Sequence, residues 1–332
     1  MARGASLPLP ARWFSIPQCF RYEETQRGRK REHFQWNMDV LGLASVAAEA
    51  ELMAAQAAFV RGTGLNLIGD TPDLVWRVSD RRVLSGALAD LGIEGDRFAA
   101  VCVIIDKRDK IGDEATAAEL AKLGVEPPAV ARILDLLDTT GIDQVAAKVG
   151  EANAGVAALR ELLALSEGFG MRHLLRVDLG VIRGLSYYTG TVWEVFAATG
   201  TFQRAIAGGG RYDRLTEQLG GKPLPMVGFG FGDIPIVEVL TEKNLMPALP
   251  RRVDDVVYPM SSSLFGLANR VAAHLRGQGR SVVVDYAQRR FKNAIAAAEA
   301  EGATRFLILG GDEVKRGVLK VRTLGAERVE AE

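Results

Sequence analysis

Residues 19–40 constrain the fold most, because their second half alternates strictly between polar and apolar side chains. Between His33 and Val40 every odd-numbered residue is polar and every even-numbered residue is apolar. A period of two predicts a β-strand with one polar and one apolar face. Residues 20–23 alternate in the same way, and a basic stretch containing a glycine joins the two runs. The segment therefore predicts an antiparallel hairpin with a long cationic loop.

The polar face of this hairpin has two interpretations. In antiparallel sheets one face is commonly exposed to solvent, and a run of charged residues such as 27–31 is usually a solvated loop. However, arginine, glutamate, glutamine and aspartate beside an arginine-rich loop also suit a ligand that carries both an anion and an amine. The spacing makes a binding face plausible and leaves both interpretations open.

Composition narrows the class of protein. The 332 residues are 48% apolar and 25% charged, which is typical of a globular chain with two or three domains and excludes disordered and fibrous classes. The 41 basic and 41 acidic residues balance, so no global field attracts nucleic acid. Two cysteines and three histidines without metal-ligand spacing predict a reducing, cytoplasmic location and no structural metal. No stretch has the apolar length of a signal peptide or a membrane span.

The chain divides into recognisable segments. An alanine-rich helix is predicted at 43–59, followed by strand-like pieces at 65–70 and 73–80. Residues 80–170 read as a separate helical unit, whose segments end at or near glycines. Strand patterns resume at 174–197, and residues 253–332 alternate as β-α-β-α-β-β, typical of a compact α/β domain. Pro247 and Pro250 suit a stiff linker before it.

Two glycine runs and one aromatic motif remain. The runs at 208–210 and 228–232 fit neither P-loop nor dinucleotide spacing, and such glycines more often mark a turn or a close approach of backbones. Residues 183–190, RGLSYYTG, place a fixed cation beside two tyrosines. They could hold a planar polar ligand, or they could form an aromatic edge of the core.

Taken together, these motifs resemble a known family. Residues 20–42 resemble motif 2 of class II aminoacyl-tRNA synthetases in its histidine-specific form, and residues 182–196 resemble the histidine-binding motif of histidyl-tRNA synthetases. Residues 207–215 and 227–233 are similar to the approach to motif 3. The C-terminal unit is similar to the anticodon-binding domain of the histidine, glycine, threonine and proline enzymes. The resemblance runs from about residue 13 to residue 328.

The resemblance implies an α/β (α+β) fold, in which an antiparallel class II sheet with helices carries a helical insertion and a C-terminal α/β anticodon-binding domain. The expected parts are an irregular segment at 1–12, a catalytic core at 13–79 and 171–243, the insertion at 80–170, a linker at 244–252 and the anticodon-binding domain at 253–332.

The resemblance also implies an activity: activation of histidine with ATP to histidyl-adenylate, followed by transfer to tRNA(His). Magnesium would accompany ATP, and neither DNA nor a membrane is expected as a partner. Arg21 and Arg183 would be the catalytic cations at the α-phosphate, and Glu23 would read the adenine side of ATP. The predicted histidine contacts are Gln35, Asp39 at the α-amino group, Tyr187 and Tyr188 around the imidazole, and Tyr212.

Three departures from the family pattern keep alternatives open. The chain begins close to motif 2, so motif 1 is expected to be absent, and a homodimer is expected only where motif 1 is present. Ser186 stands where the family usually has aspartate, and Pro235 stands where many class II enzymes carry the motif 3 arginine. The chain could therefore be a shortened ligase that is inactive alone, or a non-catalytic paralogue that senses histidine or tRNA. A third alternative makes the C-terminal domain the only working part, an RNA-binding module.

Overall fold

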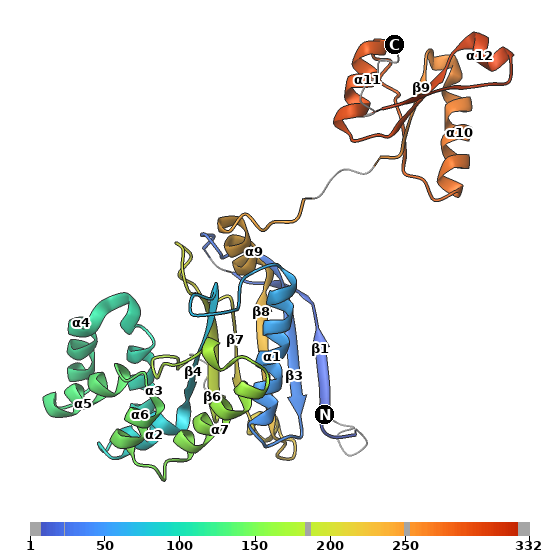
Figure 1. Cartoon of the computed structure of the whole chain (residues 1–332). Helices are drawn as coiled ribbons and strands as arrows, with labels where there is room; N and C mark the ends of the chain where they lie inside the picture. Colours follow the sequence, from blue (N-terminus) through green and yellow to red (C-terminus); the bar gives the residue numbers. More distant parts are fainter. Residues whose placement is uncertain (1–7, 23, 183–186, 249–252, 325–332) are drawn as a thin grey trace. The chain divides into compact units, whose positions relative to one another are not determined.

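The computed structural model describes residues 8–22, 24–182, 187–248 and 253–324. It separates into two compact units, Met1–Met246 and Pro247–Glu332 (Figure 1). No helix in these described ranges is long and apolar enough to cross a bilayer.

A large, mainly antiparallel sheet forms the centre of the first unit. Its strand order is β1-β3-β8-β7-β6-β4-β5, with β2 also paired to β3. Only the contact between β4 and β5 is parallel among the pairings described. The strands are β1 (Ala11–Ser15), β2 (Gln18–Phe20), β3 (Glu32–Leu41), β4 (Leu74–Asp80), β5 (Leu175–Val177), β6 (Thr191–Ala197), β7 (Ala207–Arg211) and β8 (Met226–Gly232).

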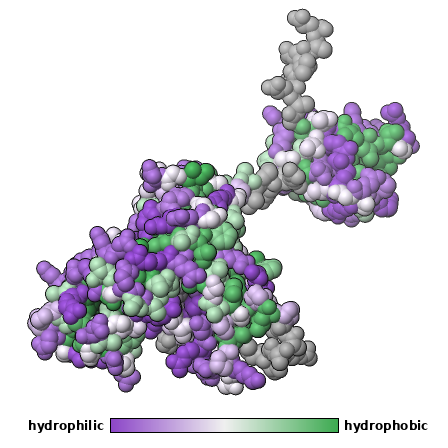
Figure 2. Space-filling model, turned by 60° about the horizontal axis from the view of Figure 1, so that its bottom comes forward, coloured by the Kyte–Doolittle hydropathy of each residue, from purple (hydrophilic) through white to green (hydrophobic). Residues whose placement is uncertain are grey.

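The predicted antiparallel hairpin is confirmed, but its first strand is β2 at Gln18–Phe20, earlier than the alternation at 20–23 indicated. Strands β2 and β3 pair antiparallel with Cys19 opposite His33, and the backbone of Arg21 continues the ladder by donating to the carbonyl of Arg31 at 2.8 Å. The apolar face is only partly buried, however. Trp36 packs on the rings of α1 and β8, whereas Phe20 and Phe34 remain 72% and 50% exposed. Figure 2 shows hydrophobic residues interspersed with hydrophilic ones on the surface.

Two long helices cover the apolar face of the sheet, α1 (Ala47–Gly62) and α7 (Ala154–Gly168) (Figure 1). The indole nitrogens of the fully buried Trp76 and Trp193 both donate to Gln56 Oε1 of α1, at 2.9 and 3.1 Å. Burying a polar indole edge is tolerable because each N–H keeps a partner. One amide therefore ties β4 and β6 to the same helix. The helix predicted at 43–59 is confirmed, although it begins four residues later.

The helical segment is built from α2 (Arg81–Ala89), α3 (Gly95–Ile105), α4 (Arg108–Lys122), α5 (Pro127–Leu137), α6 (Ile142–Val149) and α7. Its helical character matches the prediction. Asp80, at the end of β4, caps α2 by accepting from the backbone N–H of Arg82 at 2.9 Å. The residues of α2 and α7 share one hydrophobic core with the sheet, so the segment packs as part of the first unit.

The strand predicted at 65–70 was wrong, because this stretch is irregular. The side chain of Asn66 accepts from the backbone N–H of Ile68 at 3.0 Å, and the backbone N–H of Asn66 donates to Asp73 at 2.7 Å. Such local bonds between side chain and backbone compete with a sheet ladder. Short helices complete this unit: η2 (Arg172–Leu174), α8 (Leu215–Gln218) and α9 (Asp233–Glu242).

The second unit has the predicted β-α-β-α-β-β order, with a further short helix before the last strand. Its sheet order is β10-β9-β11-β12, parallel except for the pairing of β11 with β12. Fully buried Asp255 accepts from the guanidinium groups of Arg280 and Arg305. The elements are β9 (Asp255–Pro259), η3 (Ser262–Leu264), α10 (Phe265–Gly277), β10 (Val282–Val284), α11 (Phe291–Ala300), β11 (Arg305–Leu309), α12 (Gly311–Lys315) and β12 (Lys320–Thr323).

Candidate active site

On the second face of the large sheet, polar side chains of β3 lie beside glycines of β7 and β8. Residues directly opposite each other in antiparallel strands share a face. Asp39 and Asn37 of β3 lie opposite two glycines of β8, and these lie opposite two glycines of β7. We call these four residues the glycine floor: Gly208, Gly210, Gly228 and Gly230.

At three of these glycines a larger residue would collide with a side chain of the same face, which at Gly210 is Tyr188 or Val192. A Cβ on Gly228 would lie 2.1 Å from Asp39 Oδ1 and 2.8 Å from the Tyr212 hydroxyl. A Cβ on Gly230 would lie 2.8 Å from Gln35 Nε2. The glycine runs are therefore a close approach, one of the two meanings that their sequence left open.

Asp39 and Tyr212 form the polar centre of this face. The Tyr212 hydroxyl donates to Asp39 Oδ1. Burial raises the pKa of the Asp39 carboxyl, and the hydrogen bond from Tyr212 opposes that shift without cancelling it. Burial, together with the negative charge of Asp39, raises the pKa of Tyr212 as well. Within the described ranges, the hydrogen bond to the Asp39 side chain comes from a neutral hydroxyl, and a half-buried carboxylate in this setting suits a cationic or N–H-donating ligand.

Two further tyrosine rings, Tyr187 and Tyr188, lie beside the ring of Tyr212. The ring centroids of Tyr187 and Tyr188 are 4.7 Å apart, and that of Tyr212 lies 5.8 Å from Tyr187 and 6.4 Å from Tyr188. Tyr188 is buried against Val192, while the other two rings are half-buried. Such rings offer flat faces and hydroxyl tips to a small planar ligand.

Gln35 lies four residues along β3 from Asp39, on the same face, and donates to Asn37 Oδ1 at 2.6 Å. Since Cys19 pairs with His33, Arg21 also belongs to this face. Arg21 pairs with Arg31, which places it about 13 Å along the strand direction from Gln35 and about 26 Å from Asp39 at ~3.3 Å per residue. The predicted face is therefore a line from Arg21 through Gln35 to Asp39. Glu23, Arg183 and Ser186 lie outside the described residues.

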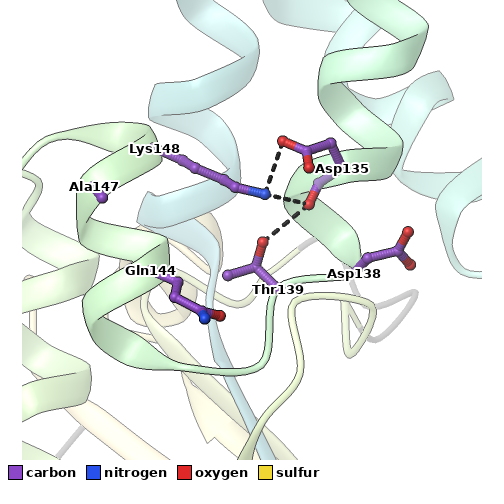
Figure 3. Close-up of a pocket in the computed structure, with 6 residues that line it drawn as sticks. All are labelled: Asp135, Asp138, Thr139, Gln144, Ala147 and Lys148. Atoms are coloured by element: carbon purple, nitrogen blue, oxygen red, sulfur yellow. Dashed lines mark hydrogen bonds and ion pairs between the residues drawn. The ribbon is translucent and has the colours of Figure 1, made fainter.

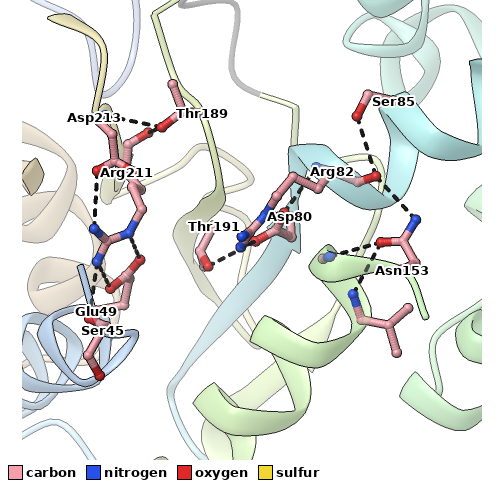
Figure 4. A network of polar contacts seen from close by, with 12 residues as sticks. Ser45, Glu49, Asp80, Arg82, Ser85, Asn153, Thr189, Thr191, Arg211 and Asp213 are labelled. Carbon is pink, nitrogen blue, oxygen red and sulfur yellow. Dashed lines mark hydrogen bonds and ion pairs between the residues drawn. The ribbon is translucent and has the colours of Figure 1, made fainter. Parts of the chain in front are cut away.

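A buried ion pair, not found from the sequence, supports the tyrosine end of the site (Figure 4). Arg211 precedes Tyr212 and donates to both carboxylate oxygens of Glu49, at 2.7 and 2.6 Å, and to Asp213 at 3.1 Å. Burial is the largest influence on the pKa of Glu49 and raises it, while the bonds from Arg211 oppose that shift. The charged residues on either side of Tyr212 were its only sequence signal. The pair anchors the end of β7 to α1.

A second polar network lies beside this pair (Figure 4). Fully buried Asp80 accepts from Arg82 at 2.7 and 2.8 Å and from the Thr191 hydroxyl at 3.1 Å. Asn153 donates to the carbonyl of Arg82 at 3.3 Å and caps α7. These contacts join β4, β6 and the two helices that pack on them, so their role is structural.

A hollow of the first unit lies away from this sheet face, between α5 and α6 (Figure 3). It measures about 470 Å³, is open to solvent, and contains an ion pair of 2.7 Å between Lys148 and Asp135. None of its lining residues is on a strand. In the described part of the chain, no three His, Cys, Asp or Glu side chains gather as metal ligands. Pro235 lies in the first turn of α9, where proline is comfortable.

A glycine-lined antiparallel sheet that carries motif 2 on β2 and β3 defines the chain as a class II aminoacyl-tRNA synthetase core. The family profile described as Histidyl-tRNA synthetase matches residues 1–232, and the profile described as Anticodon binding domain matches residues 254–331. The chain belongs to the histidyl-tRNA synthetase family. The family and fold predicted from the motifs are thereby confirmed.

The names of similar proteins agree with this family assignment. The chain is 40% identical to the chloroplastic/mitochondrial histidine–tRNA ligase of Arabidopsis thaliana, over 98% of this chain and 66% of the relative. It is 36% identical to the histidine–tRNA ligase of Opitutus terrae, over 97% of this chain and 74% of the relative. The histidyl-tRNA synthetase structure from Nostoc sp. PCC 7120 has the same fold, with a TM-score of 0.73 at 24% identity, over 97% of this chain and 78% of that one. The chain thus spans about two thirds to three quarters of these relatives. None of these matches favours the regulatory alternative.

Proposed function

We propose that this chain is a histidine–tRNA ligase, which activates histidine with ATP and passes the histidyl group to tRNA(His). Family membership over both units supports the activity. The observation that carries the proposal is the line of polar groups along β3, because it matches a ligand with an imidazole at one end and a phosphate at the other. Cytoplasmic location and a homodimer remain predictions.

The order of the polar groups along the line orients the substrate. The histidine carboxylate must reach the α-phosphate near Arg21, so its α-amino group, one carbon away, belongs nearer Gln35. The imidazole then lies at the far end, where Asp39 and the three tyrosines gather. This differs from the role that the motif implied for Asp39, which was to receive the α-amino group. We propose instead that Asp39 accepts a hydrogen bond from an imidazole N–H, because its position favours that end.

The chemistry needs positioned cations and no covalent enzyme intermediate. An oxygen of the histidine carboxylate attacks the α-phosphorus in line, and pyrophosphate leaves. Arg21, and Arg183 by its motif, would offset the charge that develops on the α-phosphate. Glu23 would read the adenine side. Magnesium would arrive with the ATP phosphates, as it commonly does in such sites. A hydroxyl of the terminal adenosine of the tRNA then attacks the activated carbonyl, and AMP leaves.

Histidine-dependent exchange of pyrophosphate into ATP tests the proposal. We expect exchange with histidine and none with other amino acids, and we expect Arg183→Ala to abolish exchange while histidine binding stays measurable. Lys148→Ala, in the hollow between α5 and α6, is the matched control and should exchange at the wild-type rate. If the wild-type chain binds histidine but does not exchange pyrophosphate, the ligase proposal is wrong and the histidine-sensing alternative is favoured.

A further inference from the structure

The tip of the hairpin between β2 and β3 is fastened to the rest of the first unit. Gln26 and Arg29 bond to each other's backbone at 3.0 and 2.9 Å, which closes the tip. Gly28 lies directly on the buried ring of Phe202, with no room for a side chain, since a Cβ there would be 2.4 Å from the ring. Its positive φ of 73° also requires glycine. The charge run was predicted to be most often a solvated loop, yet its tip is packed.

Arg27 provides the polar part of this fastening. Its guanidinium donates to Glu238 at 2.9 Å and to Glu242 at 2.5 Å, both on α9, and to the Thr201 hydroxyl at 2.8 Å. Each guanidinium nitrogen therefore has its own acceptor. Chain segments far apart in sequence meet at this one side chain: the hairpin tip, the loop between β6 and β7, and α9.

The acceptors are fixed by other contacts. Glu242 also accepts from the hydroxyl and, at 3.3 Å, from the backbone N–H of Thr201. The bonds from Thr201 and then from Arg27 lower the pKa of Glu242, so the pair stays ionised at neutral pH. Arg204, from the same loop as Thr201, donates to the side chain of Gln26. Charged groups that share partners in this way couple more strongly than one isolated surface pair.

We propose that Arg27 is a positioning residue that clamps the hairpin tip onto α9 and the β6–β7 loop and thereby sets the affinity for ATP. The proposal rests on the proposed function. Arg21 lies on the segment that leads into the tip, so its placement depends on where the tip is held. Gln35 and Asp39 lie inside the sheet with β8 alongside them, so the clamp should leave histidine binding unchanged.

The test compares Arg27→Ala and Arg27→Lys with the matched control Lys30→Ala, which removes a cation from the same loop. For Arg27→Ala we expect the KM for ATP to rise about 5- to 20-fold, the range for a small network of partly exposed ion pairs. The KM for histidine should stay within about twofold, and Arg27→Lys should recover part of the loss because an ammonium can still meet one acid. Lys30→Ala should leave both KM values unchanged.

Hydrogen exchange at the backbone amides of Gln26 and Arg29 tests the clamp independently of activity. We expect faster exchange at both in Arg27→Ala, with exchange in β3 and β8 unchanged. Unchanged exchange at the tip would overturn the clamp even in an active protein. Equal rises in both KM values, or a rise for ATP in Lys30→Ala as large as in Arg27→Ala, would overturn the positioning role. A wild-type chain without pyrophosphate exchange would refute the proposed function and, with it, the effect on ATP.

Discussion

Replacing Gly228 by alanine should damage histidine recognition while changing one methyl group. The added Cβ would lie 2.1 Å from Asp39 Oδ1, 2.8 Å from the Tyr212 hydroxyl and 2.8 Å from the carbonyl oxygen of Met38. The first two contacts can open only by separating Asp39 from Tyr212. The third is backbone of a strand paired on both sides, which has little freedom to move.

Two magnitudes follow. Overpacking of this kind costs about 1–3 kcal/mol of folding free energy, which corresponds to a fall of about 2–12 °C in Tm for a unit of this size. Displacing Asp39 weakens one hydrogen bond to a charged group, worth about 1.5–3 kcal/mol, so the KM for histidine should rise about 10- to 150-fold. The KM for ATP should change much less, because Arg21 lies at the other end of the line.

Pyrophosphate exchange at varied histidine and ATP, together with thermal unfolding, measures both effects. Gly62→Ala is the control, since nothing lies within 4 Å of a Cβ at that position. Gly230→Ala should be intermediate, because it meets the movable amide of Gln35. A Gly228→Ala protein with a wild-type KM for histidine would refute the assignment of Asp39 and Tyr212 to the histidine end of the site.

Two further predictions concern charge. Because burial raises the pKa of Asp39, the folded protein holds that proton more tightly than the unfolded chain, so stability falls as pH rises from about 4 through the folded pKa. Asp39→Asn should therefore unfold at a higher temperature than wild type at pH 7, with the gain shrinking toward pH 4, while losing histidine affinity; a Tm difference that does not vary with pH would contradict this. Arg211→Met leaves fully buried Glu49 unpaired, and should cost about 3–5 kcal/mol, or about 6–20 °C in Tm. Adding Glu49→Leu to Arg211→Met should restore part of the lost stability. If Arg211→Met alone has the wild-type Tm, the Arg211–Glu49 pair does not anchor β7 to α1.

The sequence predicted the strand that carries the candidate site better than it predicted which residues cover that strand. The period of two in residues 33–40 predicted β3 and its polar face, and the register with β2 and β8 confirms that Arg21, Gln35 and Asp39 share that face. Periodicity says which side chains point the same way and nothing about what covers them. For that reason the exposure of Phe20 and Phe34 could not be predicted.

Contacts made only in the folded chain were also beyond the sequence. Arg211 and Glu49 are 162 positions apart, and Arg27 and Glu242 are 215 apart, so no local pattern connects either pair. The roles of Glu23 and Arg183 remain predictions from their motifs. The helical segment was predicted as a separate unit because its pattern is helical with glycine stops, yet helices α2 to α7 all contribute buried residues to the core that they share with the sheet.

The glycine floor also affects the entropy of binding. Each flexible side chain that a ligand immobilises at an interface costs about 0.5–1.5 kcal/mol in lost rotamer freedom. Glycine has no rotamers, and the backbone of Gly230 is already paired with β3 on one side and β7 on the other. A substrate that contacts half-buried Gly230 therefore immobilises no side chain of that residue, and the entropic cost of binding falls only on neighbours such as Gln35.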